Sequence, residues 1–311
     1  MSGRARAVGS TGQLADGLRT GHDLFIQRTH AGAILVAPAI LTVWATYVAA
    51  RGGFAKWQLF LALGGYVLTM LGVTVGFHRL FAHRAFTTSA WIRICLAILG
   101  SMAAQGPPIY WVSNHRRHHA NSDSPGDPHS PHLDSGEPRG TWAGFRHAHF
   151  GWMFTHELTD GTAFSRDLYQ DRYLMWVNQR YLWWVALGLL APAAVGVLME
   201  MSLRAALSGF LWGGGVRLFV SFHMTASINS ITHLFGYRSF DTRDHSRNNA
   251  WLGLVTLGEA WHNNHHASPA NAVFGLRWWE TDIGGAFIRL LEFMRLAANV
   301  RRSLKFGGRS S

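Results

Sequence analysis

The sequence predicts an all-α integral membrane protein whose four helices span the bilayer. Three observations lead to this fold class. The chain contains four apolar runs, each near the length of about 20 residues that a helix needs to cross the hydrocarbon core. The link inside each pair of runs is so short that it allows only a turn. The dense histidine clusters all lie outside these two hairpins, so that a single side of the membrane carries them.

The first two runs form the first hairpin. Residues 31–50 (AGAILVAPAILTVWATYVAA) and residues 57–77 (WQLFLALGGYVLTMLGVTVGF) contain no charged side chain. The link at 51–56 leaves room for little more than a turn. The alternative is a pair of buried helices in a large soluble protein, but a soluble core seldom offers two such long runs so close in sequence. We therefore expect both runs to cross the membrane.

The second hairpin consists of the runs at 183–199 and at about 205–228, joined by residues 200–204. Arg217 stands inside the fourth run, where a charge is costly and is often functional. The alternatives are that the helix projects beyond the bilayer at this point or that the side chain snorkels. His223 in the same run either supports a metal site or pairs with a polar neighbour.

The remaining segments, residues 1–30, 78–182 and 229–311, share one side of the membrane because both short links lie on the other. They hold most of the arginines of a chain with net charge +11, and the positive-inside rule places them in the cytoplasm. We expect a multi-pass protein of the inner (cytoplasmic) membrane, folded as one domain over residues 1–311. Residues 1–28 lack the apolar core of a secretory signal and are expected to form a loosely ordered tail.

Cysteine usage excludes several kinds of site. The chain has a single cysteine, Cys95, which the sequence places as a small apolar residue on a helix. One cysteine cannot provide a disulfide framework, a cysteine-ligated zinc site or an iron–sulfur cluster within this chain.

Histidines gather in four segments on the expected cytoplasmic side: HRLFAH at 78–83, HRRHH at 115–119, NSITH at 229–233 and HNNHH at 262–266. Neutral imidazole is a common metal ligand, and residues three or four apart share a face of a helix. The candidate ligands are His78, His83, His115, His118, His119, His233, His262, His265 and His266, with Asn229 nearby. Nine imidazoles are too many for one ion but suit two ions with four or five ligands each. An all-nitrogen set fits iron, copper, zinc or nickel, and a site at the membrane surface favours iron and oxygen chemistry on an apolar chain.

The spacing of the first cluster sets a condition on this site. His78 and His83 are five residues apart, which is about 140° around a regular helix. They can share a site only if the helix ends or distorts between them, or if the metal lies at a helix end.

The isolated His22, His30 and His245 are expected to be surface or satisfied core residues. Intermediate cases, which either orient metal-bound imidazoles or are simply solvated, are His129, His132, His147, His149 and His156, near Asp123 and Asp127.

Taken together, these segments resemble the membrane fatty-acyl desaturases, and in particular their delta-9 group. The resemblance runs from about residue 70 to about residue 290, and its combination of motifs is highly specific. The motifs are GFHRLFAHRAF, HRRHH, DPH at 127–129, GWMF at 151–154, NSITHLFGYRSFD at 229–241 and GEAWHNNHHA at 258–267. The resemblance implies four transmembrane helices capped by a cytosolic helical domain. It also implies a di-iron centre held by nine histidines, with an asparagine near one iron through water.

Carried over to this chain, the resemblance also divides the ligands between the two irons. One iron takes His78, His83, His119 and His266, with Asn229 close by through water. The other iron takes His115, His118, His233, His262 and His265.

The chain departs from the animal acyl-CoA enzymes in two places. Ser113-Asn114 stands directly before HRRHH, where those enzymes usually carry Arg-Asp near the CoA head group. The stretch 129–146 is also longer and richer in proline and glycine. We therefore expect the acyl carrier to be a lipid or an acyl carrier protein at least as readily as CoA.

The resemblance implies the removal of two hydrogens from an unactivated methylene pair of a saturated long acyl chain, with O2 as oxidant and a cis double bond as product. The electrons must come from outside, because the chain shows no haem signature, cysteine cluster or Rossmann glycine pattern. A separate donor such as ferredoxin with its reductase is expected. The positive net charge would steer an acidic donor, although topology and anionic lipid explain much of that charge.

Three other functions stay open. A hydroxylase shares the first hydrogen abstraction, and an acetylenase would act on an existing double bond. A membrane metal-binding or transport protein is a different class, and transport predicts ionisable groups along the spans. The first two spans have none, which disfavours it.

Overall fold

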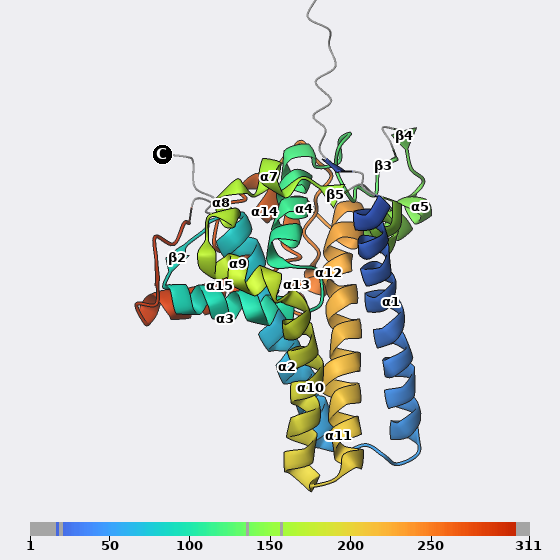
Figure 1. Ribbon diagram of the computed structural model, residues 1–311. Coiled ribbons are helices and arrows are strands. Elements are labelled where there is room, and N and C mark those ends of the chain that lie inside the picture. Colours follow the sequence, from blue (N-terminus) through green and yellow to red (C-terminus); the bar gives the residue numbers. More distant parts are fainter. Residues whose placement is uncertain (1–16, 19–20, 135–136, 156–157, 303–311) are drawn as a thin grey trace, which may run out of the picture.

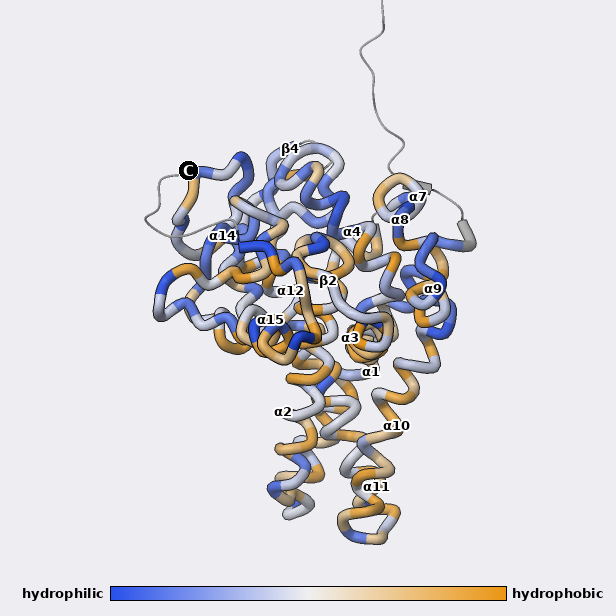
Figure 2. The backbone as a smooth tube through the Cα atoms, turned by 90° about the vertical axis from the view of Figure 1, so that its left-hand side faces the viewer, coloured by the Kyte–Doolittle hydropathy of each residue, from blue (hydrophilic) through white to orange (hydrophobic). Residues whose placement is uncertain are grey.

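The computed structural model describes residues 17–18, 21–134, 137–155 and 158–302, and it is mostly helical (Figure 1). Four long apolar helices form a stalk, and the shorter elements gather into a cap at one end of it. Figure 2 shows hydrophobic residues predominating along the stalk and hydrophilic ones at the outer end of the cap. The predicted helical architecture with four apolar spans is confirmed.

The apolar helices of the stalk are longer than the runs that predicted them. The spans cover Asp23–Ala50, Lys56–Ala82, Tyr181–Glu200 and Leu203–Leu234. Their elements are α1 (Gly21–Ala50), α2 (Lys56–Leu71) continuing into the π-helix η1 (Gly72–Ala82), α10 (Tyr181–Glu200), and α11 (Leu203–Gly209) continuing through η3 (Phe210–Val216) into α12 (Arg217–Leu234). Residues 21–28, expected as part of a loose tail, are the first turns of α1. The rest of that expected tail falls largely on residues 1–16 and 19–20, outside the described residues.

Both hairpin turns lie at the end of the stalk away from the cap (Figure 1). There the indole nitrogen of Trp57 donates a hydrogen bond to the Glu200 carboxylate at 2.8 Å, which ties the two hairpins together. Large apolar side chains such as Val43, Phe60 and Leu198 are exposed along the stalk. An exposed apolar belt of this kind is what hydrocarbon, rather than water, would cover.

A close helix crossing fixes the position of η1. Helix α3 (Ala90–Ser101) crosses the stalk where the cap begins, as Figure 1 shows. Gly72 lies at this crossing, and a Cβ atom there would meet the backbone nitrogen of Gly100 at 2.1 Å. Only glycine allows such an approach. The crossing therefore holds the start of η1 against α3.

The cap consists of short helices around η1 and α12. In chain order they are α4 (Pro108–Asn121), α5 (Thr141–Arg146), the π-helix η2 (His147–Gly151), α6 (Trp152–Thr155), α7 (Gly161–Phe164), α8 (Arg166–Tyr169), α9 (Arg172–Gln179), α13 (Ala250–Gly253), α14 (His262–Ala267) and α15 (Ile283–Phe293). Three two-residue antiparallel ladders join distant segments. They pair β1 (Gly17–Leu18) with β5 (Leu158–Thr159), β2 (Thr87–Thr88) with β6 (Ala297–Ala298), and β3 (Leu133–Asp134) with β4 (Glu137–Pro138).

The hydrophobic core of the cap surrounds η1. Phe77 and Phe81 on η1 are almost fully buried, together with Val112 of α4 and Ile288 of α15. Burying aromatic side chains of this size stabilises a fold by a few kcal/mol each, on the order of 1.5–3 kcal/mol. The core thus packs η1 against both α4 and α15, so that the residues on η1 are held rigidly.

Arg217 is neither exposed nor snorkelling, although it stands in the fourth span. Its side chain is buried, and its three nitrogens donate to the carbonyl oxygens of Gly213 (2.7 Å), Met102 (2.9 Å) and Gly188 (2.9 Å). A buried charge is tolerated only when its hydrogen bonds are satisfied. Arg217 therefore links α12 to α10 and to the end of α3, a structural role that snorkelling does not describe.

Candidate metal centre

All four histidine clusters converge at the junction of stalk and cap. The nine candidate imidazoles fall into two groups, in each of which the ligand atoms lie within 4.8 Å of one another. The first group contains His78, His83, His115, His119 and His265. The second group contains His118, His233, His262 and His266. Segments that are up to 188 residues apart in the chain, from His78 to His266, therefore meet at one place.

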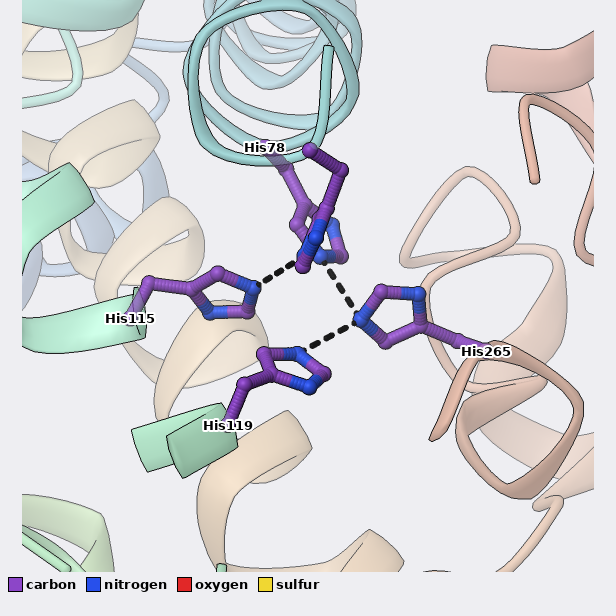
Figure 3. Close-up of side chains that lie close together, drawn as sticks. His78, His115, His119 and His265 are labelled. Carbon is purple, nitrogen blue, oxygen red and sulfur yellow. Dashed lines mark hydrogen bonds between the residues drawn. The ribbon is translucent and has the colours of Figure 1, made fainter. Parts of the chain in front are cut away.

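The first group has its ring nitrogens in close contact. Figure 3 shows the rings of His78, His115, His119 and His265 turned toward one another. His78 Nε2 lies 3.0 Å from His265 Nε2, and His265 Nε2 lies 2.9 Å from His119 Nε2. His83 Nε2 lies 2.7 Å from His115 Nε2. Nitrogens that share one ion through bonds of roughly 2.0–2.1 Å lie about 3 Å apart, so these separations suit a shared metal.

The wide turn of η1 explains how His78 and His83 share a group. The amide nitrogen of His83 donates to the carbonyl oxygen of His78 at 3.1 Å, which is the five-residue bond of a π-helix. This bond replaces the four-residue bond of an α-helix, so that residues five apart come onto one face. The expected distortion between the two histidines is present, and their ring centroids are 4.9 Å apart.

Arg116 holds the end of η1. It lies between the ligands on α4, and its guanidinium donates to the carbonyl oxygens of Phe81 (2.7 Å) and Ala82 (3.0 Å). The same guanidinium pairs with the Asp167 carboxylate at 2.6 Å. The last carbonyls of a helix have no partner within it. Arg116 supplies that partner directly before His83.

The two groups differ at three residues from the division of ligands that the resemblance implies, and that division stays a prediction. His115 and His265 lie in the first group rather than the second, and His266 lies in the second rather than the first. The reason is helix geometry. His115 and His119 are four apart on α4, and His262 and His266 are four apart on α14, so each pair shares a face. The remaining histidine of α4, His118, lies in the second group, and the remaining histidine of α14, His265, lies in the first group.

Four of the nine histidines have a carboxylate at the nitrogen that faces away from the group. The contacts are His118 Nδ1 with Asp127 (3.0 Å), His233 Nδ1 with Asp123 (2.8 Å), His266 Nδ1 with Asp244 (2.6 Å), and His78 Nδ1 with Glu259. Such partners fix the ring orientation and the tautomer and raise the basicity of the other nitrogen. Sequence reasoning allowed this role for Asp123 and Asp127, but it missed Asp244 and Glu259.

Burial and neighbouring groups shift the pKa of two imidazoles of the first group and of one carboxylate beside the second. Burial lowers the pKa of His115 and His119 well below the usual value, and neighbouring imidazoles add to the effect. A neutral imidazole has a free lone pair for a metal. Burial acts to raise the pKa of Asp244, but the hydrogen bond and charge of His266 outweigh it and hold that pKa below its usual range.

Three buried ring nitrogens of the second group have no hydrogen-bond partner among the described residues: Nε2 of His118, Nε2 of His266 and Nδ1 of His262. The Nδ1 atoms of His118 and His266 are bound to aspartates, so in these two rings Nε2 is the nitrogen left for a ligand. A buried polar atom without a partner lowers the stability of the fold by about 1–3 kcal/mol. A metal ion at this point would remove that cost, so the donor set fits a metal.

An apolar cavity of ≈ 290 Å³ adjoins the first group. His115 of the first group and Asn229 form part of its wall. Asn229 precedes His233 by one turn of α12, as expected from their spacing. The rest of the wall is mainly apolar and comes from α1, α4, α6 and α12, with Ile34, Trp111, Met153, Phe222 and Ala226 among its residues.

The residues that precede the second histidine cluster have internal partners. Ser113 is buried and its hydroxyl contacts Ser165 at 2.9 Å, away from the cavity wall. Asn114 is part of that wall, and its side-chain oxygen accepts from Thr159 at 2.7 Å. Of Ser113 and Asn114, only Asn114 therefore borders the cavity.

The remaining histidines lie outside the two groups. His129 stacks on His118, with ring centroids 4.4 Å apart. His223 pairs with His149 at 3.0 Å between ring nitrogens, so its predicted polar neighbour is a histidine of η2. His132 contacts the carbonyl oxygen of His233 at 2.9 Å. His30 contacts the Tyr181 hydroxyl at 3.0 Å, His245 is exposed, and His156 is outside the described residues.

Four apolar spans and a double histidine cluster beside an apolar cavity define an integral membrane protein with a candidate metal centre. Comparison with known proteins identifies the family. Residues 55–283 match the fatty acid desaturase family. The chain belongs to this family, and its curated relatives place it among the delta-9-like members. It is accordingly an oxidoreductase that acts on fatty acyl chains.

Three relatives illustrate the range of the family. The chain is 42% identical over 278 residues to a hex-5-enoyl-[acyl-carrier protein] acetylenase of Moorena producens (strain JHB), covering 89% of this chain and 87% of the relative. It is 37% identical to an sn-1 stearoyl-lipid 9-desaturase of Anabaena variabilis, covering 74% and 79% respectively. It is 36% identical to a delta-9 acyl-lipid desaturase of Arabidopsis thaliana, covering 78% and 74%.

Proposed function

We propose that the protein is an oxygen-dependent fatty-acyl desaturase that introduces a cis double bond, at the delta-9 position, into a long saturated acyl chain. Two iron ions would be held by the nine histidines, the first group binding one and the second group the other, with Asn229 near one of the irons through water. The cap would lie on the cytoplasmic side of the inner membrane, as the positive-inside rule favours.

A single observation carries this proposal: the apolar cavity reaches the first histidine group at His115. Its wall joins apolar side chains of the stalk, such as Ile34 and Phe222, to His115 and Asn229. An acyl chain is apolar and would enter such a space from the membrane side without loss of favourable contacts. The cavity would thus present a methylene pair to the metals and exclude water from it.

The residues around the metals would position the ligands. When bound, the irons would supply the activation of O2 and the abstraction of hydrogen. The carboxylates of Asp127, Asp123 and Asp244 would hold protons on Nδ1 of their histidines and leave Nε2 for coordination. Glu259 would do the same for His78. The core around η1 would keep His78 and His83 at fixed positions during turnover.

Two partners belong to this proposal. Electrons would come from an external donor such as ferredoxin with its reductase. The acyl group would arrive on a lipid or on an acyl carrier protein at least as readily as on CoA. The relatives support a non-CoA carrier, because one is named for an acyl-carrier-protein substrate and another for a stearoyl lipid.

Expression in a host that lacks desaturases tests the proposed function. Mass spectrometry of lipids and acyl thioesters should show a cis alkene at a fixed position of a saturated chain. His262→Ala, in the second group, should abolish the product. His245→Ala is the matched control, because its ring belongs to neither group. A hydroxylated product without an alkene would point to the hydroxylase instead.

A second candidate function is supported by one comparison. The relative that is 42% identical over 89% of this chain is named as an acetylenase acting on a hex-5-enoyl group. The same hydrogen abstraction, applied to an existing double bond, would give an alkyne. Supplying matched saturated and monounsaturated chains separates the two reactions. Alkyne formed only from the unsaturated chain would support the acetylenase and contradict the desaturase.

A further inference from the structure

The carboxylates around the two histidine groups are distributed unequally. In the second group, three of the four histidines have an aspartate at Nδ1. In the first group, one of the five histidines, His78, has a carboxylate there, that of Glu259. The three aspartates come from the loop after α4 and from the segment after α12, so both flanks of the second group contribute negative charge.

The charge of Glu259, the carboxylate of the first group, is also partly offset by a buried cation that Glu259 shares with Asp282. Arg79 follows His78 on η1 and is completely buried. Its Nη1 lies 2.6 Å from Glu259 Oε1, and its Nη2 lies 3.0 Å from Asp282 Oδ1. Within the described ranges, by contrast, no ion pair joins an arginine or lysine to the aspartates of the second group, whose partners are histidines, hydroxyls and backbone amides.

This asymmetry acts on a bound cation in two ways. A buried negative charge attracts a nearby cation more strongly than the same charge would in water, and a neighbouring cation cancels that attraction. A carboxylate on Nδ1 also makes Nε2 a better donor. The first group has one more imidazole, which adds a donor but no charge. Loss of one carboxylate from the Nδ1 of a metal-bound histidine costs about 10- to 100-fold in metal affinity. The three carboxylates of the second group, against one in the first, therefore outweigh the extra neutral ligand of the first group.

We infer that the two groups bind divalent metal with unequal affinity: the second group, with its three aspartates that pair with no arginine or lysine, fills first, and the first group, where Arg79 offsets part of the charge of the one carboxylate, fills last. This inference rests on the proposed function, in that both groups must bind metal. It makes Asp123, Asp127, Asp244 and Arg79 positioning and charge-setting residues that touch the ligands rather than the substrate.

A Co2+ titration of the full-length protein in detergent, stripped of metal with a chelator, tests the inference. Ligand-field absorbance and calorimetry should show two binding phases that differ at least about tenfold in affinity. His262→Ala, in the second group, should weaken the tight phase alone. His83→Ala, in the first group, should weaken the weak phase alone. Gel filtration and thermal unfolding of each apo variant check that it is folded.

A matched pair of carboxylate variants refines the test without removing any ligand. Asp127→Asn should weaken the tight phase by about 10- to 100-fold and leave the weak phase unchanged. Glu259→Gln should affect only the weak phase. Neither readout depends on activity, and a purely structural role of these carboxylates would change both phases together.

The outcomes separate the inference from the proposed function. A single phase that binds two Co2+ ions with equal affinity, and loses one of them in each histidine variant, would overturn the inference and leave the two-metal site intact. A tight phase that disappears with His83→Ala would also overturn it. If neither histidine variant changed the Co2+ stoichiometry, the proposed function would fail together with the inference.

Discussion

The backbone amide of His83 donates to the carbonyl oxygen of His78 at 3.1 Å, a bond that spans five residues. This bond brings two histidines that a regular helix would separate by about 140° onto one face. A π-helical turn is often found at functional sites because the extra residue re-aims side chains at the cost of weaker backbone geometry. In this chain it supplies two of the five imidazoles of the first group.

We expect protein purified without added zinc to contain two iron ions per chain, because the nine imidazoles form two separate groups. His233→Ala should lower the iron content, and His245→Ala, outside both groups, should leave it unchanged. Metal analysis by mass spectrometry measures both. A content near one in the wild type, with no loss in His233→Ala, would contradict the two-metal proposal.

Gly72→Ala should destabilise the protein, because the new Cβ would meet the Gly100 backbone nitrogen at 2.1 Å. Overpacking of this kind typically costs about 1–3 kcal/mol. Gly64→Ala is the matched control on the same helix, since a Cβ there meets nothing within 4 Å. Thermal unfolding in detergent, followed by the loss of monodisperse protein, compares the two. Equal midpoints would show that α3 can move away from η1 at little cost.

Arg116→Gln should reduce the occupancy of the first group, because Arg116 bonds the last carbonyls of η1 directly before His83. Arg84→Gln is the control: Arg84 pairs with the same Asp167 carboxylate but is mostly exposed. Exposed ion pairs contribute little, at most about 1 kcal/mol. Metal content and thermal stability should therefore fall in Arg116→Gln alone. Similar losses in both variants would assign the effect to Asp167 instead.

Turnover should require an added electron carrier, because the chain has no internal redox signature besides the candidate metal centre. Purified protein with NAD(P)H and O2 should form no product. Addition of ferredoxin and its reductase should restore product formation, measured as alkene by mass spectrometry. Full activity with reduced nicotinamide alone would refute the external-donor proposal.

The acyl carrier should be distinguishable by salt dependence. One acyl chain, supplied as CoA thioester, carrier-protein thioester and phospholipid under equal electron supply, should react on the lipid or carrier protein at least as fast as on CoA. Acyl carrier protein is acidic, so added salt should screen its attraction to a chain of net charge +11. A lipid substrate should show much weaker salt dependence. Turnover of the CoA form alone would defeat the carrier proposal.

The sequence was sufficient to predict the four spans, because long apolar runs mark them directly. It also predicted the meeting of the histidine clusters, because two short links place all four clusters on one side of the membrane. The grouping of the rings also has a signal in the sequence: His115 with His119, and His262 with His266, are four apart and share faces. The division that the resemblance implies separates these pairs, and it stays a prediction.

Other features had no local signal. Asp244 reaches His266 across 22 residues, and Glu259 reaches His78 across 181. Contacts at such separations depend on how the cap packs, which periodicity does not encode. The π-helical turn depends on Gly72 meeting α3 and on Arg116 meeting the end of η1, and both are also tertiary contacts.

Arg217 has a consequence for how the chain is assembled during synthesis. A charged residue near the middle of a span raises the cost of inserting that helix by about 2.5–3.5 kcal/mol. All three of its acceptors, the carbonyls of Met102, Gly188 and Gly213, come earlier in the chain. When the ribosome delivers Arg217, its binding partners have already been made, and α10 is joined to it by a single tight turn. We therefore expect the last two spans to enter the bilayer as a preassembled hairpin rather than one after the other.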